Sequence, residues 1–287
     1  MRESASFWSR GVDAAAWRES STREVDREDA RAYNRFIVEV PSRLKCYWRL
    51  QTLLAPKLQA PQYVYFATLA RFLDRTPVWL DVGCGRAIVP EWFHPTDLVR
   101  YQRAVDRAKM LVGIDDDEKS LRDSGLVRKV RGNIETLPFA TGTFDLVSAN
   151  MVVEHLQHPE PSLLEIARIL KPSGILVFHT VNLRSPFITL QALAADWLKR
   201  ALIRLVESRK DEDVFKAYYR LNTSSTIEKC AEAAGFRVVE IKTVCSPPMT
   251  WGLGPLAAFE LLIIRLLGWE ALGALRPNLI AVLERAS

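Results

Sequence analysis

The fold is decided by the stretch Val78-Trp79-Leu80-Asp81-Val82-Gly83-Cys84-Gly85-Arg86-Ala87, in which an apolar run is broken first by an acid and then by two glycines. We expect a buried strand over 78–82 and a tight turn after it, because glycine lets the backbone bend and approach a ligand without a Cβ. Residues 87–89 are apolar and predict the first turn of a helix, whose free N–H groups would point back at that ligand. The pattern predicts a nucleotide-type binding corner.

The spacing argues against two common nucleotide sites. A dinucleotide fingerprint needs a third glycine where Ile88 stands, and a phosphate-binding loop needs a Gly-Lys-Ser/Thr sequence that is absent here. The stretch instead resembles the first motif of class I S-adenosylmethionine-dependent methyltransferases, of the small-molecule type. The resemblance implies that Gly83, Cys84 and Gly85 contact the methionine portion of the cofactor, and that Asp81 lies near its ammonium group, directly or through water. The final alanine of the stretch replaces a glycine that is usual in the family.

Composition limits the class of protein. With 287 residues, 48% hydrophobic and 25% charged, the chain suits one large soluble domain with additions. The net charge is only +5 and no long basic run occurs, so we expect no nucleic-acid partner. Four cysteines without paired spacing are typical of reduced thiols in a cytoplasmic protein, and no signal-peptide core or 18-residue apolar run is present.

A second apolar run, over 110–115, ends in Asp115. A carboxylate at the tip of the second strand can accept hydrogen bonds from both hydroxyls of a ribose, so Asp115 is the ribose candidate and Asp116 a neighbour that supports it. The separation from the glycines is about 30 residues, against roughly 20 for a minimal unit, and we assign the excess to a loop over 94–109. The acids that follow, Asp117 and Glu118, suit the start of a helix.

Residues 132–139 read Gly-Asn-Ile-Glu-Thr-Leu-Pro-Phe after a predicted third strand over 126–130. In the methyltransferase family the matching turn carries aspartate and holds the adenine. Asn133 is compatible with that role because its carbonyl oxygen can still accept a hydrogen bond from the adenine amino group. Ile134 would then press on the ring face. The alternative is that Asn133 only shapes the turn.

The later motifs follow in the family order. A strand over 143–150 ends in Asn150, which the resemblance places at the cofactor, and Glu154-His155-Leu156 leaves it. An amphipathic helix from 159, with Leu163, Leu164, Ile166, Ala167 and Leu170 inward, then leads through Lys-Pro-Ser-Gly into a strand over 175–182. With the first motif, the resemblance covers about 78–182.

We therefore expect an α/β fold: a Rossmann-like, doubly wound, seven-stranded sheet, mostly parallel with an antiparallel last strand, and ligand at the strand C-termini. Strands over 236–244 and 278–284 would close it. We expect an N-terminal extension or lid over 1–60 and the methyltransferase domain over 61–287, with substrate-side insertions about 183–223 and 245–275. Before the first strand, a helix over 62–73 would turn Val64, Phe66, Leu69, Phe72 and Leu73 inward.

Candidate acceptor residues lie after the fourth and fifth strands. His155 is the candidate general base for a hydroxyl or phenol acceptor, with a structural histidine as the alternative. Tyr218, Tyr219 and Arg220 are candidate substrate contacts, or else part of a loop that caps the next helix. We expect no metal site, because the neighbouring Glu154, His155 and His158 would point in different directions.

Three functions stay open. The first is transfer of a methyl group from S-adenosyl-L-methionine, leaving S-adenosyl-L-homocysteine, to O, N or C of a quinone-, lipid- or secondary-metabolite-like acceptor. The second is methylation of a protein or nucleic acid, although 148–153 lacks the Asn/Asp-Pro-Pro-Tyr/Phe sequence of adenine and glutamine methyltransferases. The third is a non-catalytic cofactor-binding protein. The apolar stretch 251–267 is either buried against the sheet or a peripheral membrane or lipid contact, and the oligomeric state is not predicted.

Overall fold

The structure is a computed structural model, and it describes residues 42–85, 101–124, 126–193, 216–248, 250 and 254–286. Several expectations lie wholly or partly outside these ranges: the helix start at 87–89, most of the extension over 1–60, the second half of the helix expected after 188, and the beginning of 251–267. Everything below concerns the described residues.

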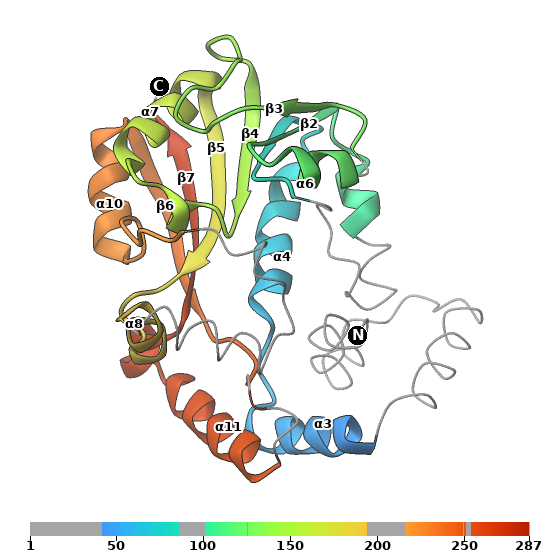
Figure 1. The fold of residues 1–287 in the computed structure, drawn as a ribbon, viewed down its shortest axis with the longest axis vertical. Helices are drawn as coiled ribbons and strands as arrows, with labels where there is room; N and C mark the ends of the chain where they lie inside the picture. The colour runs from blue at the N-terminus through green and yellow to red at the C-terminus, as the bar shows by residue number, and fades with distance from the viewer. Residues whose placement is uncertain are drawn as a thin grey trace, which may run out of the picture.

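The described residues form a seven-stranded sheet with the order β3-β2-β1-β4-β5-β7-β6 (Figure 1). β7 is antiparallel to both neighbours, β5 and β6, and the other neighbouring strands pair in parallel. The predicted fold class is confirmed. The strands are β1 (Val78–Val82), β2 (Met110–Asp115), β3 (Lys129–Arg131), β4 (Phe144–Asn150), β5 (Leu170–Val181), β6 (Phe236–Val244) and β7 (Asn278–Arg285).

Helices cover both faces of the sheet. On one face α4 packs against Trp79, Val177 and Ile280, and on the other α7 and α10 pack against Leu80 and Phe178. Neighbouring strand residues such as Trp79 and Leu80 point to opposite faces because side chains alternate along a strand. The helices are α3 (Ser42–Leu54), α4 (Pro61–Leu73), α6 (Glu118–Asp123), α7 (Pro159–Ile169), α8 (Pro186–Leu193), α10 (Ser224–Ala233) and α11 (Pro255–Leu267), with 3₁₀ turns η1 (Val153–His155) and η3 (Glu270–Leu275).

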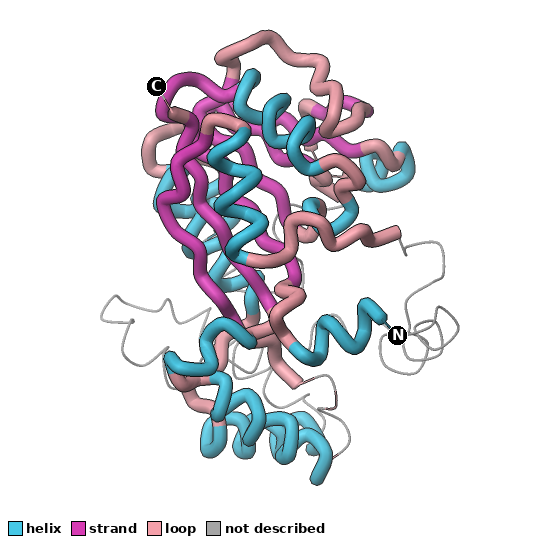
Figure 2. The backbone as a smooth tube through the Cα atoms, turned by 90° about the vertical axis from the view of Figure 1, so that its left-hand side faces the viewer, coloured by secondary structure: helices cyan, strands magenta, loops and turns pink. Residues whose placement is uncertain are grey.

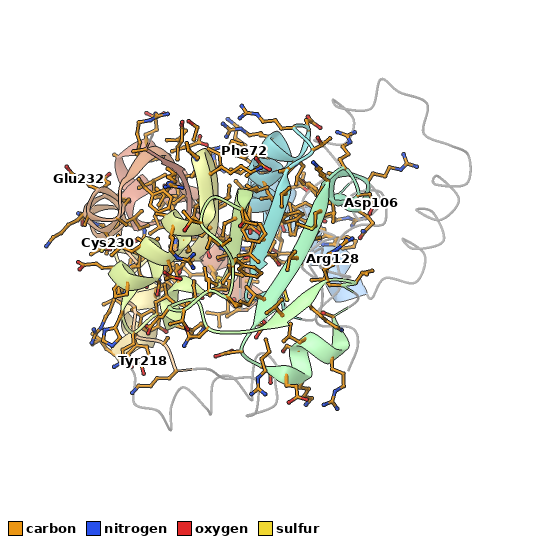
Figure 3. All side chains as sticks on the ribbon, turned by 90° about the horizontal axis from the view of Figure 1, so that it is seen from above. Phe72, Asp106, Arg128, Tyr218, Cys230 and Glu232 are labelled. Atoms are coloured by element: carbon orange, nitrogen blue, oxygen red, sulfur yellow. The ribbon has the colours of Figure 1, made fainter. Side chains whose placement is uncertain are left out.

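The structure corrects the predicted faces of two helices. In α4 the buried residues include Tyr63, Tyr65 and Thr68, whereas the predicted inward residues Val64 and Phe72 are only partly buried. In α7 Leu164 is exposed and Ser162 is buried in its place. In both helices a polar or amphipathic side chain faces the core. A prediction made only from the spacing of apolar residues cannot identify such a position. Figure 3 shows Phe72 of α4 and Tyr218 on opposite sides of the molecule.

The loop expected over 94–109 is partly helical. Residues 101–105 form helical turns, and Tyr101 and Val105 are buried in the core beside α4. The third strand, expected over 126–130, is confined to the three residues of β3. Short edge strands of this kind limit pairing with other chains.

The helices α3, α8 and α11 lie beyond the carboxyl ends of the parallel strands, at the end of the molecule opposite the C-terminus (Figures 1 and 2). Of the two alternatives for the apolar stretch, burial against the sheet does not hold for α11, which packs on α3. Their shared cluster is separate from both sheet cores and contains Tyr47, Ala55, Leu58, Ala257, Leu261 and Ile264. Among the described residues no helix is long and apolar enough to span a bilayer.

The packing of α11 on α3 can be tested with two neighbouring leucines. Leu261 is 0% exposed and Leu262 is 46% exposed. We expect Leu261→Ala to lower the free energy of unfolding by about 2–5 kcal/mol, since it leaves a cavity. Leu262→Ala, the matched control, should change it by less than about 1 kcal/mol. Urea unfolding followed by circular dichroism measures both, and equal effects would contradict a one-sided burial of α11.

Candidate functional site

The turn after β1 has the conformation that its glycines predict. Gly83 and Gly85 have φ angles of 63° and 53°, in the left-handed region. A Cβ on Gly83 would lie 2.3 Å from Cγ2 of Val152, so no side chain fits there. The N–H of Gly83 donates to the carbonyl of Ile114 at 2.8 Å, which holds the turn against the end of β2.

A cavity of about 200 Å³ lies beside this turn and is lined by Tyr65, Phe66, Leu69, Asp81, Gly83, Cys84, Gly85 and Asn150. The structure therefore brings together the four residues predicted from the first motif and Asn150 from β4. The Cys84 thiol is buried, and burial with the nearby Asp81 and Asp115 carboxylates raises its pKa to about 12. A thiol that stays protonated is a poor nucleophile, so we interpret Cys84 as a small residue that fills space beside the turn.

Asp81 is a buried carboxyl group with a raised pKa. It is 7% exposed, and Ser148 Oγ donates to it while accepting from Trp79 Nε1 at 2.7 Å. Burial raises the pKa of Asp81 to about 7, against the hydrogen bond from Ser148, and the negative charge of Asp115 adds to the rise. A positively charged ligand group beside Asp81 would stabilise its ionised form. The carboxyl is thus suited to an ammonium partner.

Asp115 ends β2 next to the glycine turn. Its Oδ2 accepts from the Gly85 N–H at 2.9 Å, and its Oδ1 accepts from the Asp117 N–H at 3.0 Å. Each carboxylate oxygen has a second lone pair, so the side chain can hold the turn and still accept from two hydroxyls. Asp117 caps α6 by accepting from the Ser120 N–H, as expected for a helix start. Asp116 is exposed, and its supporting role stays a prediction.

Asn133 shapes a turn. Its Oδ1 accepts from the Glu135 N–H at 2.9 Å, which is the turn-shaping role left open above. The turn begins beside the ribose candidate, because the Gly132 N–H donates to the Asp115 carbonyl at 3.1 Å. Ile134 is half-buried and packs against the core. The second lone pair of Asn133 Oδ1 keeps the adenine role possible, and that role stays a prediction.

Asn150 is oriented by a buried histidine that sequence reasoning passed over. His179 of β5 contacts the Asn150 amide through Nδ1 at 2.8 Å and Asn278 Oδ1 through Nε2 at 3.1 Å. Burial lowers the His179 pKa to about 4, although the hydrogen bond to Asn278 opposes this, so the ring is neutral and has one N–H. Asn278 donates its amide to Ser246 at 2.7 Å, so its oxygen accepts from Nε2–H.

This leaves Nδ1 of His179 as an acceptor. The structure records Asn150 Oδ1 beside this nitrogen. We assign the flipped amide, with its NH₂ toward the ring, because amide oxygen and nitrogen positions follow from the hydrogen-bond network. The carbonyl oxygen of Asn150 is then the polar atom that a ligand in the cavity meets. Three strands, β4, β5 and β7, are joined in this arrangement.

The segment after β4 is tied to the segment before α10. The Glu154 carbonyl accepts from the N–H groups of Tyr218 and Tyr219 at 2.8 and 3.0 Å. The Glu154 carboxyl is buried, which raises its pKa, and it accepts from Thr180 Oγ1 at 2.8 Å. Tyr219 has a φ of 54°, uncommon for a residue with a side chain. The predicted base and two predicted substrate contacts are thus neighbours in space.

His155 has a defined tautomer. Its Nδ1 lies 3.0 Å from the Lys216 carbonyl, and a carbonyl can only accept, so Nδ1 carries the proton. In the neutral ring Nε2 then holds the lone pair, which a general base requires. Arg220 Nη1 donates to the Gln157 carbonyl at 2.9 Å, and Tyr218 contacts the Lys216 ammonium at 4.9 Å. A substrate role for the three residues 218–220 stays a prediction.

Sequence reasoning missed four residues that build the site: Tyr65, Ser148, Val152 and His179. Two of them could have been found from the sequence, because Ser148 and His179 are polar residues within otherwise apolar predicted strands. Tyr65 and Val152 carried no such signal, since their roles depend on the pairing of distant segments. Within the described residues no group of three or more His, Cys, Asp or Glu side chains is placed to hold a metal ion.

Known proteins resemble the chain at the level of sequence. A profile for a family described as a methyltransferase domain matches residues 58–241. An uncharacterised methyltransferase of Schizosaccharomyces pombe is 27% identical over 149 residues, 48% of this chain and 51% of the relative. The ubiquinone biosynthesis O-methyltransferase of Xanthomonas oryzae is 32% identical over 138 residues, 46% of this chain and 54% of the relative. The chain thus spans about half the length of these curated relatives.

A solved structure shares the fold. A crystal structure of an S-adenosylmethionine-dependent methyltransferase from Mesorhizobium loti superimposes with a TM-score of 0.51 at 18% identity, covering 79% of this chain and 98% of that one. At this identity the likeness concerns the fold alone.

The raised pKa of Asp81 predicts how stability depends on pH. The folded pKa is about 7 and the ordinary value is 3.8, so folding favours the protonated carboxyl. That stabilisation is complete below the ordinary value and is lost as the pH rises through 7. We expect Asp81→Asn, which stays neutral and can accept from Ser148, to unfold at a higher temperature than the wild type at pH 8, with the difference vanishing near pH 4.

Asp145→Asn is a control of opposite sign. Burial raises the pKa of Asp145, but the hydrogen bonds from Lys171 and from the Val78 N–H outweigh it and lower the pKa. This variant should unfold below the wild-type temperature at pH 8. Thermal unfolding at pH 4, 6 and 8 measures both variants. If the unfolding temperatures of Asp81→Asn and the wild type differed by the same amount at every pH, the raised pKa of Asp81 would be contradicted.

Proposed function

The chain belongs to the family of methyltransferase domains, and from this premise we propose that it transfers the methyl group of S-adenosylmethionine to a small-molecule acceptor. The observation that carries the proposal is the grouping of two acids around one glycine turn. Asp81 and Asp115 flank the turn at Gly83, where a side chain is sterically excluded. Asp81 lines the cavity and Asp115 accepts from the Gly85 N–H at the edge of the same turn, and two acids so placed suit a ligand with a cationic end and a ribose.

The residues fit the cofactor part by part. The buried Asp81 carboxyl suits the ammonium of the methionine portion, and Asp115 has lone pairs for the two ribose hydroxyls. Ile134 offers an apolar contact and Asn133 a polar one at the adenine end, which lies beside Asp115 through Gly132. Asn150 lines the same cavity as Asp81 and offers its amide to the ligand.

Bound S-adenosylmethionine supplies an activated methyl group and its own leaving group, S-adenosylhomocysteine. The task of the protein is to align the acceptor with that methyl group and to exclude water. His155, with its lone pair on Nε2, takes the proton from a hydroxyl or phenol acceptor. Its Nδ1–H bond to the Lys216 carbonyl stabilises the positive charge that the ring gains.

An oxygen acceptor is favoured among O, N and C. Two relatives carry O-methyltransferase in their names, one of ubiquinone biosynthesis (32% identical) and one acting on malonyl-[acyl-carrier protein] (30% identical over 106 residues, Enterobacter lignolyticus). A histidine with a fixed tautomer beside the exit of β4 matches the need for a base. We therefore place the acceptor near His155, with Tyr218 and Tyr219 beside it.

Cofactor binding is tested by calorimetry. We expect S-adenosylmethionine to bind the wild type, and Asp115→Ala to weaken binding by about 100-fold, since two charge-assisted hydrogen bonds are lost. Glu118→Ala, an exposed acid three residues away, should bind normally. Asp115 also braces the turn, so thermal unfolding must show that the variant is folded. Failure of the wild type to bind would overturn the proposal.

The base role of His155 is tested by turnover. With a methyl-labelled cofactor and a panel of phenols and hydroquinones, His155→Ala should lower kcat by about 10²–10⁴-fold and leave cofactor affinity unchanged. His158→Ala, an exposed histidine three residues on, is the matched control and should retain full activity. Unchanged turnover in His155→Ala would make His155 a structural residue.

A further inference from the structure

One face of α11 is apolar and exposed. While Ala257, Leu261 and Ile264 pack on α3, the opposite side shows Leu256, Phe259, Leu262 and Leu266, and the row continues to Trp269. Phe259 is 61% exposed and Trp269 is 64% exposed. Single exposed apolar residues are normal, but a row of five at helical spacing is the kind of patch that marks an interaction site.

A second helix at the same end repeats the pattern. In α8, Phe187, Leu190 and Leu193 are exposed, Leu190 by 72%, and the helix has no charged residue. Figures 1 and 2 show α8 and α11 at the same end of the molecule, beyond the carboxyl ends of the strands. We call the exposed apolar residues of α8 and α11 the apolar end.

The charges on these helices are mainly positive. Exposed cations on α3, α8, α11 and their flanks are Arg49, Lys57, Arg184 and Arg265. Among the described acids of these segments, Glu260 accepts from Thr250 at 2.7 Å, and Glu270 is exposed. Apolar side chains with cations beside them match the acyl chains and acidic head groups of a membrane surface.

We propose that the apolar end docks on the surface of an anionic lipid bilayer, with α8 and α11 lying in the interface. The 13 residues of α11 extend about 20 Å, too short to cross a hydrocarbon core of about 30 Å. The helix must therefore lie along the surface. Trp269, at its end, is a residue type that favours the membrane–water boundary.

The charge pattern favours a lipid surface over a second copy of the chain. A symmetric pair would bring the same patch from each partner face to face. The two partners would then oppose the same set of cations to each other, which would repel: Arg49, Lys57, Arg184 and Arg265. An acidic head-group layer offers the opposite charge over its whole plane.

The docked orientation would turn the carboxyl edge of the sheet toward the bilayer. A lipid-like acceptor would then reach the region of His155 and Tyr218 from the membrane side, a consequence that rests on the proposed methyl transfer. The docking itself concerns surface residues only and can be tested without cofactor or acceptor.

Vesicle co-sedimentation of the full chain tests the docking. We expect the wild type to bind phosphatidylcholine vesicles with about 30% phosphatidylglycerol, at least tenfold more tightly than vesicles of phosphatidylcholine alone. The double variant Phe259→Ser/Leu262→Ser should lose at least tenfold in binding. Leu164→Ser, an equally exposed leucine on α7, should bind as the wild type does. The pair Arg49→Glu/Lys57→Glu should lower the preference for the anionic vesicles.

Absence of binding by the wild type, or equal binding by Phe259→Ser/Leu262→Ser, would overturn the docking. A second result would also overturn it: the wild type runs as a dimer in size-exclusion chromatography, the double variant runs as a monomer, and the wild type does not bind vesicles. The apolar end would then be covered by a second copy of the chain. Calorimetry with S-adenosylmethionine on the same variants is read separately. A variant that loses vesicle binding but binds the cofactor normally bears on the docking proposal alone. Failure to bind the cofactor bears on the proposed methyl transfer alone.

Discussion

The structure depends on one carboxyl group buried at the end of a strand. Asp81 sits where β1 stops and the glycine turn begins, and its hydrogen-bond partner Ser148 stands on the neighbouring β4, held in turn by Trp79. Burying a carboxyl group is costly unless it is protonated or paired. β1 therefore carries near its end a carboxyl group whose neutral form is favoured by burial, and a cation beside it would stabilise the ionised form.

A second polar arrangement extends this order across the sheet. His179, neutral because it is buried, joins Asn278 on β7 to Asn150 on β4, so the antiparallel strand that closes the sheet also orients a residue of the cavity. Glu154 and Thr180 tie the exit of β4 to β5 and to Tyr218 in the same way. Buried polar networks of this kind specify one geometry when every member has a partner. The position of Asn150 thus depends on the closing strand β7, and that of His155 on the contacts of Glu154 with β5 and with Tyr218.

Much of the fold and the cofactor corner follows from short-range patterns. The strand–glycine turn, the acid ending β2 and the helix start at Asp117 depend on residues close in sequence, and the structure shows each of them. What could not be predicted depends on distant pairing. Tyr65 lines the cavity because of the rotation of α4 about its axis on the sheet. Similarly, α11 packs on α3 rather than on the sheet. The sequence alone could not decide whether Asn133 shapes a turn or binds a ligand, because its side-chain carbonyl oxygen can accept a hydrogen bond in either role.

The separate cluster that joins α3 and α11 has a consequence for how such an enzyme diversifies. Because Tyr47, Leu58 and Leu261 pack among themselves and outside both sheet cores, this unit can be exchanged without rearranging the layers that carry the cofactor turn. Val152 is the opposite case, since its methyl group fills the space above Gly83 and couples the exit of β4 to the turn. Substitutions in the helical end can therefore accumulate without disturbing the turn after β1, while changes around Val152 have to remain compatible with that turn.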